Sequence, residues 1–185
     1  KTNGDYNIEP KYRDAGAFKN GLAPVNENGL YGYINSKGDY EINPIYVSAL
    51  SYSAIKTGSN YVQYLAAVNL DGNWGYIDMS GDFIINPKYD AALPFTEEVA
   101  WVKTDYKWGL IDRKDNVLIE FNYVYAGMFS SGLSAVVHNG KKFYIDKKGK
   151  DAGILKITAN NVTGNVINNL NNSNSVVLTP SVGSK

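Results

Sequence analysis

Residues that could carry out catalysis are scarce in this chain of 185 residues. It contains no cysteine, which excludes thiolate chemistry and Cys-ligated zinc or iron–sulfur sites. Its one histidine, His138, precedes Asn139-Gly140, a pair that predicts a tight turn. The sequence has neither a Gly-x-Ser-x-Gly nucleophile motif nor a Gly-x-x-x-x-Gly-Lys-Ser/Thr phosphate loop. We therefore expect His138 to be a solvated turn residue, and we expect no catalytic residue and no cofactor.

Acidic residues recur at one position of a repeated motif, as Asp78, Asp112 and Asp146. Calcium binds about six to eight oxygens, usually from several neighbouring acids, and no Asp-x-Asp-x-Asp-Gly run is present. The first residue of a tight turn often accepts a hydrogen bond from the backbone two residues later. We expect these aspartates to cap turns and to bind no metal, with a ladder of calcium ligands as the alternative. Glu97-Glu98, the adjacent acid pair, would point to opposite faces of a strand, which argues against a glycosidase pair.

One tryptophan is a candidate ligand-binding residue. Trp101 stands where the other copies of the repeat carry a small residue or proline (Pro24, Ala67 and Ala135). The core therefore does not require a large ring at this position. An exposed Trp101 near Tyr106 could stack on a sugar or anchor a partner protein, and local repacking of the core is the alternative.

An insertion supplies the other candidate. The segment Val47–Asn60 contains 14 residues where the other copies have about five. A long loop on a rigid scaffold is a typical contact site, although a tolerated surface insertion is the alternative. Tyr52 lies in this segment, so the ligand-binding candidates are Trp101, Tyr106 and Tyr52.

The motif that contains these positions is repeated. Asn73-Trp74-Gly75-Tyr76-Ile77-Asp78 recurs around Gly32 and Gly109, and in an altered form around Phe143. These four centres are 43, 34 and 34 residues apart. Further blocks keep the same spacing: Ile-Asn-Pro-Lys-Tyr at 85–89, and a block that begins at Phe18, Phe95 and Phe129, which we align with Tyr61 in the second copy. The chain is therefore a tandem repeat of about four units with a 34-residue period.

Each unit predicts about three antiparallel strands and a short crossing segment. Asn28-Gly29, Asp71-Gly72 and Asn139-Gly140 each separate two apolar runs, which indicates type I′ hairpins. Asp105-Tyr106 breaks the pattern, and because tyrosine disfavours positive φ we expect a different turn there. Pro87 is expected to end the third strand. Gly75 leaves room for a neighbouring backbone or ring, and the rings of successive copies are expected to stack into a continuous core.

The predicted architecture is all-β: a tandem array of antiparallel three-stranded units, open and curved, with closure into a barrel or propeller as the alternative. The units span about residues 4–38, 38–81, 81–115 and 115–149 within an array of residues 1–150. Residues 151–185 are expected to form a closing strand and then an Asn- and Ser-rich tail or linker. The chain starts in the middle of a unit, so we expect either that further repeats precede it or that a strand from the C-terminal end completes the first unit.

The Trp-Gly-Tyr/Leu-Ile-Asp motif, the Asn-Pro-Lys/Ile-Tyr block and the 34-residue period together resemble the bacterial WG-repeat family, over about residues 4 to 150. The resemblance implies repeat-mediated binding outside the cytoplasm, in a secreted, lipid-anchored or surface protein, and it supplies no catalytic residues. The sequence departs from the motif at Tyr31, at Lys142-Phe143 and at Phe121.

These observations favour a non-catalytic binding module that recognises a protein or a cell-envelope glycan, and the alternative is a structural spacer without a ligand. The 18 basic and 18 acidic residues balance, so no excess charge attracts nucleic acid. No apolar run approaches the roughly 18–20 residues of a membrane span. We expect a monomer.

Overall fold

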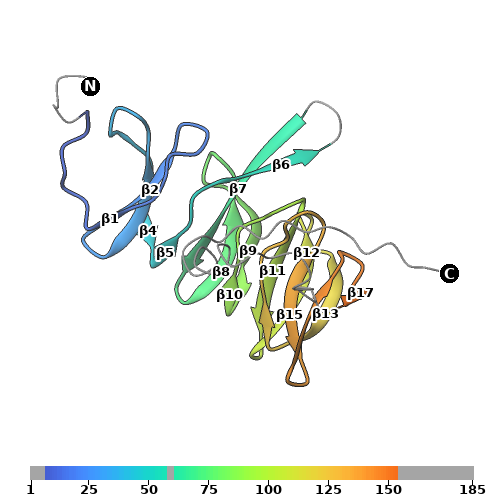
Figure 1. The fold of residues 1–185 in the computed structure, drawn as a ribbon. Helices are drawn as coiled ribbons and strands as arrows, with labels where there is room; N and C mark the ends of the chain where they lie inside the picture. The colour runs from blue at the N-terminus through green and yellow to red at the C-terminus, as the bar shows by residue number, and fades with distance from the viewer. Residues whose placement is uncertain (1–6, 58–60, 154–185) are drawn as a thin grey trace, which may run out of the picture. The chain divides into compact units, whose positions relative to one another are not determined.

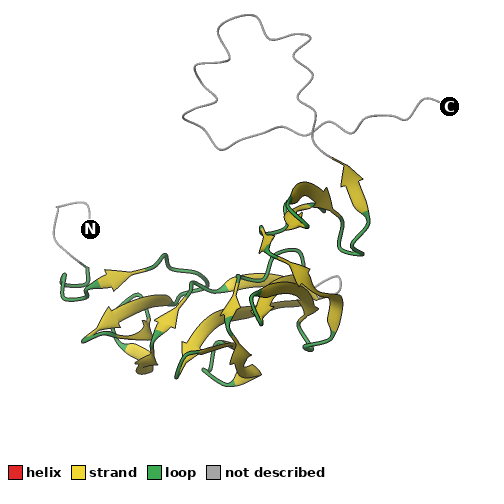
Figure 2. Cartoon of the chain, turned by 90° about the horizontal axis from the view of Figure 1, so that it is seen from below, coloured by secondary structure: helices red, strands yellow, loops and turns green. Residues whose placement is uncertain are grey.

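The computed structural model describes residues 7–57 and 61–153, and within them every element is a β-strand (Figures 1 and 2). The strands form four successive sheets in which every pairing is antiparallel. The first sheet consists of β1 (Asp14–Ala15), β2 (Ala23–Glu27), β3 (Leu30–Ile34) and β4 (Tyr40–Tyr46). The second consists of β5 (Ser48–Ala49), β6 (Ser53–Thr57), β7 (Tyr61–Leu70), β8 (Asn73–Ile77) and β9 (Phe83–Tyr89).

The third and fourth sheets repeat the same order. The third consists of β10 (Ala91–Ala92), β11 (Val99–Thr104), β12 (Lys107–Asp112) and β13 (Val117–Tyr123). The fourth consists of β14 (Tyr125–Ala126), β15 (Ser134–His138), β16 (Lys141–Ile145) and β17 (Asp151–Gly153). None of these sheets closes into a barrel, which confirms the predicted array of antiparallel repeats. The expected crossing segment is a two-residue edge strand that opens each sheet.

The chain passes from one sheet to the next within one residue. Val47, Asp90 and Val124 are these connecting residues, and each donates its backbone N–H to the second strand of the new sheet. The four sheets therefore span residues 14–46, 48–89, 91–123 and 125–153. Each sheet begins about ten residues after the start of the corresponding unit expected from the motifs, which is about a third of the repeat period. The possible closing strand at 154–157 and the tail lie outside the described residues.

The core lies between the sheets, because the central strands of the second and third sheets bury side chains on both of their faces. In β8, Tyr76 packs into a cluster shared with the third sheet, whereas Ile77 packs into a cluster shared with the first. In β12, Leu110 packs toward the fourth sheet and Ile111 toward the second. Successive side chains of a strand point to opposite faces, so the pairs Tyr76-Ile77 and Leu110-Ile111 each join three consecutive sheets. This arrangement confirms the core predicted between the copies.

The central glycine of the motif is required by a close backbone contact. A Cβ atom on Gly75 would lie 2.5 Å from the carbonyl oxygen of Ile85 and 2.8 Å from the nitrogen of Pro87. The pairing register of β8 and β9 shifts at this point, and β9 continues through Pro87 to Tyr89. The prediction that Pro87 ends the strand is therefore wrong. A proline fits at a bulge because the ladder requires no N–H donor there.

The two-residue hairpin turns have the predicted conformation. Asn28-Gly29, Asp71-Gly72 and Asn139-Gly140 all have positive φ at both residues. Asp105 and Tyr106 also have positive φ, at 48° and 62°, so the prediction of a different turn there is wrong. The pairing of Thr104 with Lys107 leaves a two-residue loop, and that loop length imposes the turn whatever residue occupies it.

Replacing Gly75 by alanine should lower the free energy of unfolding by about 2–3 kcal/mol, because the new methyl group meets backbone atoms that cannot rotate away. Urea denaturation measures the loss. Gly109→Ala is the matched comparison, since a Cβ atom there meets the ring of Phe121 at 2.9 Å rather than a main chain. We expect a smaller loss in that variant, and equal losses would contradict the explanation.

Candidate functional site

The structure places Trp101 in the core. Only 1% of its surface is exposed, so the expectation of an exposed tryptophan is wrong. Its ring lies nearly parallel to that of Phe129, with an 8° interplanar angle and 6.0 Å between centroids, and meets Tyr123 edge-on. Trp101 therefore packs the third sheet against the fourth and presents no ring face to a ligand.

The reason for a large ring at this position lies on the neighbouring strand. In the second sheet Ala67 is opposite Tyr76, and in the third sheet Trp101 is opposite Leu110. The large ring and the small side chain have thus changed strands. Tyr76 contacts Phe95 of the next sheet, with centroids 4.7 Å apart, just as Trp101 contacts Phe129.

The tyrosine of the second sheet also donates a hydrogen bond to the next sheet, and in the third sheet Trp101 and Ser134 together replace this bond. The hydroxyl group of Tyr76 donates to the carbonyl oxygen of Leu93 at 2.7 Å, and burial raises the pKa of Tyr76, so the hydroxyl stays protonated. In the third sheet the indole Nε1 of Trp101 donates to Ser134 at 3.0 Å, and the Ser134 hydroxyl donates to the carbonyl oxygen of Gly127 at 2.6 Å. Ser134 occupies a position that holds alanine in the other copies. The exchange of rings and this serine are the sequence signal that identifies Trp101 as core.

Tyr52 is also a core residue, with 3% of its surface exposed. Its ring lies 4.9 Å from that of Tyr33, and its hydroxyl group donates to the backbone oxygen of Asp78 at 2.8 Å. It occupies the place that Phe95 has in the third sheet, so Tyr52 and not Tyr61 begins this block of the second copy. The expectation that Tyr52 contacts a ligand at the surface is wrong for this reason.

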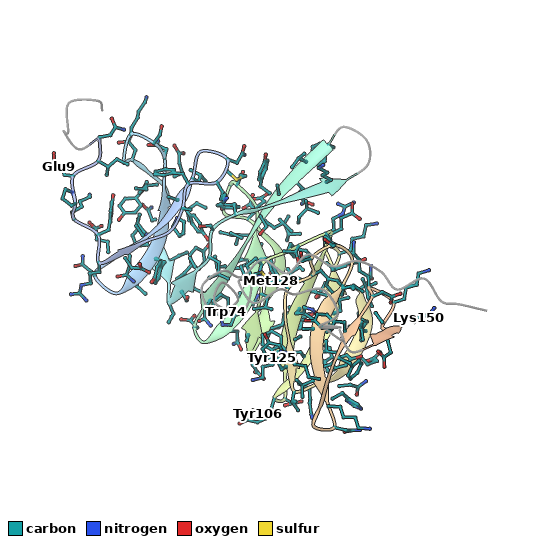
Figure 3. All side chains as sticks on the ribbon, in the orientation of Figure 1. Glu9, Trp74, Tyr106, Tyr125, Met128 and Lys150 are labelled. Carbon is teal, nitrogen blue, oxygen red and sulfur yellow. The ribbon has the colours of Figure 1, made fainter. Side chains whose placement is uncertain are left out.

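Tyr106 differs from both, because 83% of its surface is exposed. It lies at the tip of the β11–β12 hairpin (Figure 3). The ammonium group of Lys103 is 5.9 Å from the centroids of both Tyr106 and Trp108. Tyr106 therefore remains an accessible ring beside a cation.

The repeated aspartates cap turns, as predicted. Asp78 Oδ1 accepts the backbone N–H groups of Ser80 and Asp82 at 2.9 and 3.1 Å. Asp112 and Asp146 accept the equivalent pairs. Burial alone would raise the pKa of Asp112, but hydrogen bonds from Asn116 and from the Lys114 amide outweigh burial and hold it below its ordinary value. The described residues contain no group of three or more His, Asp or Glu side chains that could hold a metal ion.

The ring of His138 has two neighbours. Its Nδ1 atom lies 3.0 Å from the carbonyl oxygen of Asn122, and the ring meets Tyr123 edge-on at 5.8 Å. Neither neighbour is a nucleophile or a carboxylate, so these contacts fix the ring in place without forming a catalytic pair.

The insertion forms a β-hairpin. Its nine additional residues lie between Tyr52 and Leu65, where β6 pairs with the first half of β7. Figure 1 shows these strands as a two-stranded ribbon that extends away from β8 and β9. Ile55 and Leu65 anchor the ribbon in the core between the second and third sheets, and Arg113 Nη1 donates to Gln63 Oε1 at 3.4 Å.

A groove lies between this hairpin and one end of the third sheet. Its larger part encloses about 670 Å³ and is lined by Lys56, Tyr61, Glu98, Asp112, Arg113, Lys114 and Asn116. A second part, of about 440 Å³, is lined by Ala54, Lys56, Glu97, Glu98 and Lys147. Lys56 and Glu98 line both parts, so the two parts adjoin, and we refer to them together as the groove. The prediction from sequence located the insertion but not the residues opposite it.

Some charged side chains in the groove already have a hydrogen bond or ion pair within the protein, and others have none among the described residues. Glu97 receives the backbone N–H of Gly132 at 3.0 Å and an ion pair from Lys147 at 3.3 Å. Within the described part of the chain, Glu98 and Lys56 have no hydrogen bond or ion pair through their charged groups. Glu98 is therefore a carboxylate free to contact a ligand.

The third repeat has lost every turn glycine that its neighbours keep. Tyr106 and Asp115 have φ values of 62° and 67° where the other three copies carry glycine. Glu98 has a φ value of 74° where the first and fourth copies carry Gly21 and Gly132. Non-glycine residues in the left-handed region cost of order 1–3 kcal/mol and cluster at functional sites. Asp115 has a structural reason, since it accepts the Tyr89 hydroxyl and pairs with Lys88. Glu98 has none among the described contacts, and it lies in the groove.

Comparison with protein families supports the repeat assignment. The family model described as WG containing repeat matches residues 1–31, 31–61, 74–108 and 108–141, which is more than half of the chain. No curated protein matches the sequence.

The exchange of rings can be tested by reversing it. Trp101→Ala should cost about 3–5 kcal/mol of unfolding free energy, because it empties a filled site between two sheets. Adding Leu110→Tyr recreates the Ala–Tyr pair of the second sheet and should recover about half of that loss or more, as measured by urea denaturation. A double variant less stable than Trp101→Ala alone would refute the exchange.

Glu98→Gly should stabilise the fold by about 0.5–1 kcal/mol. Relief of the left-handed conformation contributes about 1–2 kcal/mol, and the greater chain entropy of glycine offsets about 0.5–1 kcal/mol of it. Gly21→Glu is the matched reverse change, at the equivalent turn of the first repeat, and should destabilise. Chemical denaturation of both variants decides the matter: a loss of stability in Glu98→Gly would mean that Glu98 has a structural role.

Proposed function

The chain belongs to the WG-repeat family, and on that premise we propose that it is a non-catalytic binding module. Its ligand is a protein or a cell-envelope glycan, and its place of action is outside the cytoplasm, as a monomer. The groove between the β6–β7 hairpin and the third sheet is the proposed binding site. Its main support is Glu98, which lines both parts of that groove, has a carboxylate unpaired among the described residues and is held in an unfavourable backbone conformation.

A binding role agrees with how the repeats are built. The three clusters between sheets are composed of buried apolar side chains, so they provide a rigid scaffold. The inserted hairpin is attached to this scaffold by Ile55 and Leu65 in the core and by the hydrogen bond between Gln63 and Arg113, and Lys56 and Tyr61 line the groove. A rigid scaffold with a variable, accessible segment is the usual arrangement of binding proteins.

The described residues include no helix long and apolar enough to cross a membrane. Beyond this finding, the proposed location rests on the resemblance to the family.

The proposal can be tested by replacing the hairpin. Exchanging Ser53–Tyr64 for the Lys19-Asn20-Gly21 turn of the first repeat gives the second repeat the same short connection as its neighbour. The intact chain and this variant are compared by thermal shift against two sets of probes: peptidoglycan fragments with common glycans, and a peptide array. We expect stabilisation of the intact chain by members of one set, and no stabilisation of the variant.

Removing Ile55 from the core will lower the stability of the replaced chain, so circular dichroism must first show that the variant is folded. Lys56→Glu and Glu98→Gln change the charge in the groove without touching the core, and they provide a second test. If no probe stabilises the intact chain, the spacer interpretation replaces the binding one.

A further inference from the structure

The outer edge of β6 is unpaired within the described structure. β6 pairs with β7 and with no other described strand. In an antiparallel pair, alternate residues direct their N–H and C=O groups away from the partner strand. β6, five residues long, therefore carries backbone donors and acceptors along its outer edge. Proteins usually cover or shorten such edges, because an exposed edge pairs readily with another extended chain.

This strand borders the groove. Ala54 and Lys56, two residues apart in β6, both line it, and Glu98 lies opposite them. A ligand in the groove thus contacts two residues of the strand whose outer edge is unpaired.

The side chains of the groove favour an anionic ligand. Lys56, Arg113 and Lys114 contribute three positive charges. Of the two acids in the same part, Asp112 is already occupied by hydrogen bonds from Asn116 and from its own turn. Hydrogen bonds from neutral amides do not cancel the charge of Asp112, so three cations and two carboxylates leave this part of the groove with an excess of one positive charge. Glu98 is the carboxylate that has no hydrogen bond or ion pair among the described residues.

We propose that the occupant of the groove is an extended peptide segment with acidic side chains, which adds to β6 as a further strand. This inference rests on the proposed function and assigns its ligand class. A peptide backbone has donors and acceptors at the spacing of a strand edge, whereas a glycan does not. The acidic side chains meet Lys56, Arg113 and Lys114, and Glu98 accepts a hydrogen bond from the peptide or repels an acid at that position, which sets the register.

Burial of Trp101 and Tyr52 removes two of the rings that could stack on a sugar. Stacking on a sugar requires an exposed ring face, and both Trp101 and Tyr52 are buried. The exposed ring of Tyr106 lies at the far end of β11 from Glu98, since β11 separates the two turns. Trp101, Tyr52 and Tyr106 therefore present no ring to this groove, and the aromatic side chain that lines it is Tyr61, with 66% of its surface exposed.

Acetylated hexapeptides that alternate threonine with glutamate are the probes for this inference. Calorimetry on the full chain should show binding to the glutamate peptides and at least tenfold weaker binding to the same peptides with glutamine. N-methylation of alternate backbone nitrogens should abolish binding in one of the two registers, because it removes the donors that pair with β6. Backbone amide shifts in NMR spectra should change at Ser53–Lys56.

Lys114→Glu should weaken binding of the glutamate peptides at least tenfold. Lys37→Glu is the matched control, because Lys37 occupies the same turn position in the first repeat and lies outside the groove. Neither lysine contacts the core, so both variants should fold. Equal losses in the two variants would show a general charge effect and overturn the proposal.

The remaining outcomes separate the inference from the function on which it rests. Glycan binding that Lys114→Glu weakens, without peptide binding, would overturn the peptide assignment and leave the binding module intact. Equal binding of the N-methylated and unmodified peptides would overturn strand addition. If neither peptides nor glycans bind, both proposals fail.

Discussion

The burial of both faces of the central strands in the second and third sheets is the constraint on which this structure depends. A strand such as β8 has no face left for solvent, because Tyr76 packs toward the third sheet and Ile77 toward the first. One four-stranded sheet would expose both sets of side chains, so a single repeat lacks a core of its own. Stability is therefore shared between neighbours, and each contact between sheets must be preserved when the sequence diverges.

The contact between the third and fourth sheets shows how that constraint acts on individual residues. Leu110 has replaced the tyrosine of the other copies, which removes both a ring and a hydrogen-bond donor from the interface. Trp101, on the opposite strand, restores the ring, and Ser134 carries the hydrogen bond to the same backbone position of the next sheet. What is conserved between repeats is the interaction across the interface, and the residue that supplies it varies. A position-by-position comparison of the copies therefore mistakes Trp101 for an addition without a structural purpose.

Because the strands hold each turn in a fixed conformation, a non-glycine residue at a turn position indicates a cost in free energy that calls for an explanation. A turn between fixed strands keeps its conformation when glycine is replaced, so the third repeat retains positive φ at Glu98 and Tyr106 at a cost in free energy. Asp115 recovers part of that cost through its bonds to the second sheet. Glu98 does not, and its position beside the inserted hairpin links two unusual features of the chain to one groove.

The sequence by itself determined the repeat, the antiparallel strands, most of the hairpin turns, the capping aspartates and the requirement for a small central residue. These features depend on contacts within a few residues or on side-chain alternation, and both are visible as patterns along the chain. Only the tertiary structure decided that Trp101 and Tyr52 are buried, that β9 passes through Pro87, and that the insertion is a hairpin bordering a charged groove. Each of these depends on what a neighbouring sheet brings into contact, often more than thirty residues away, and no local pattern records such a contact.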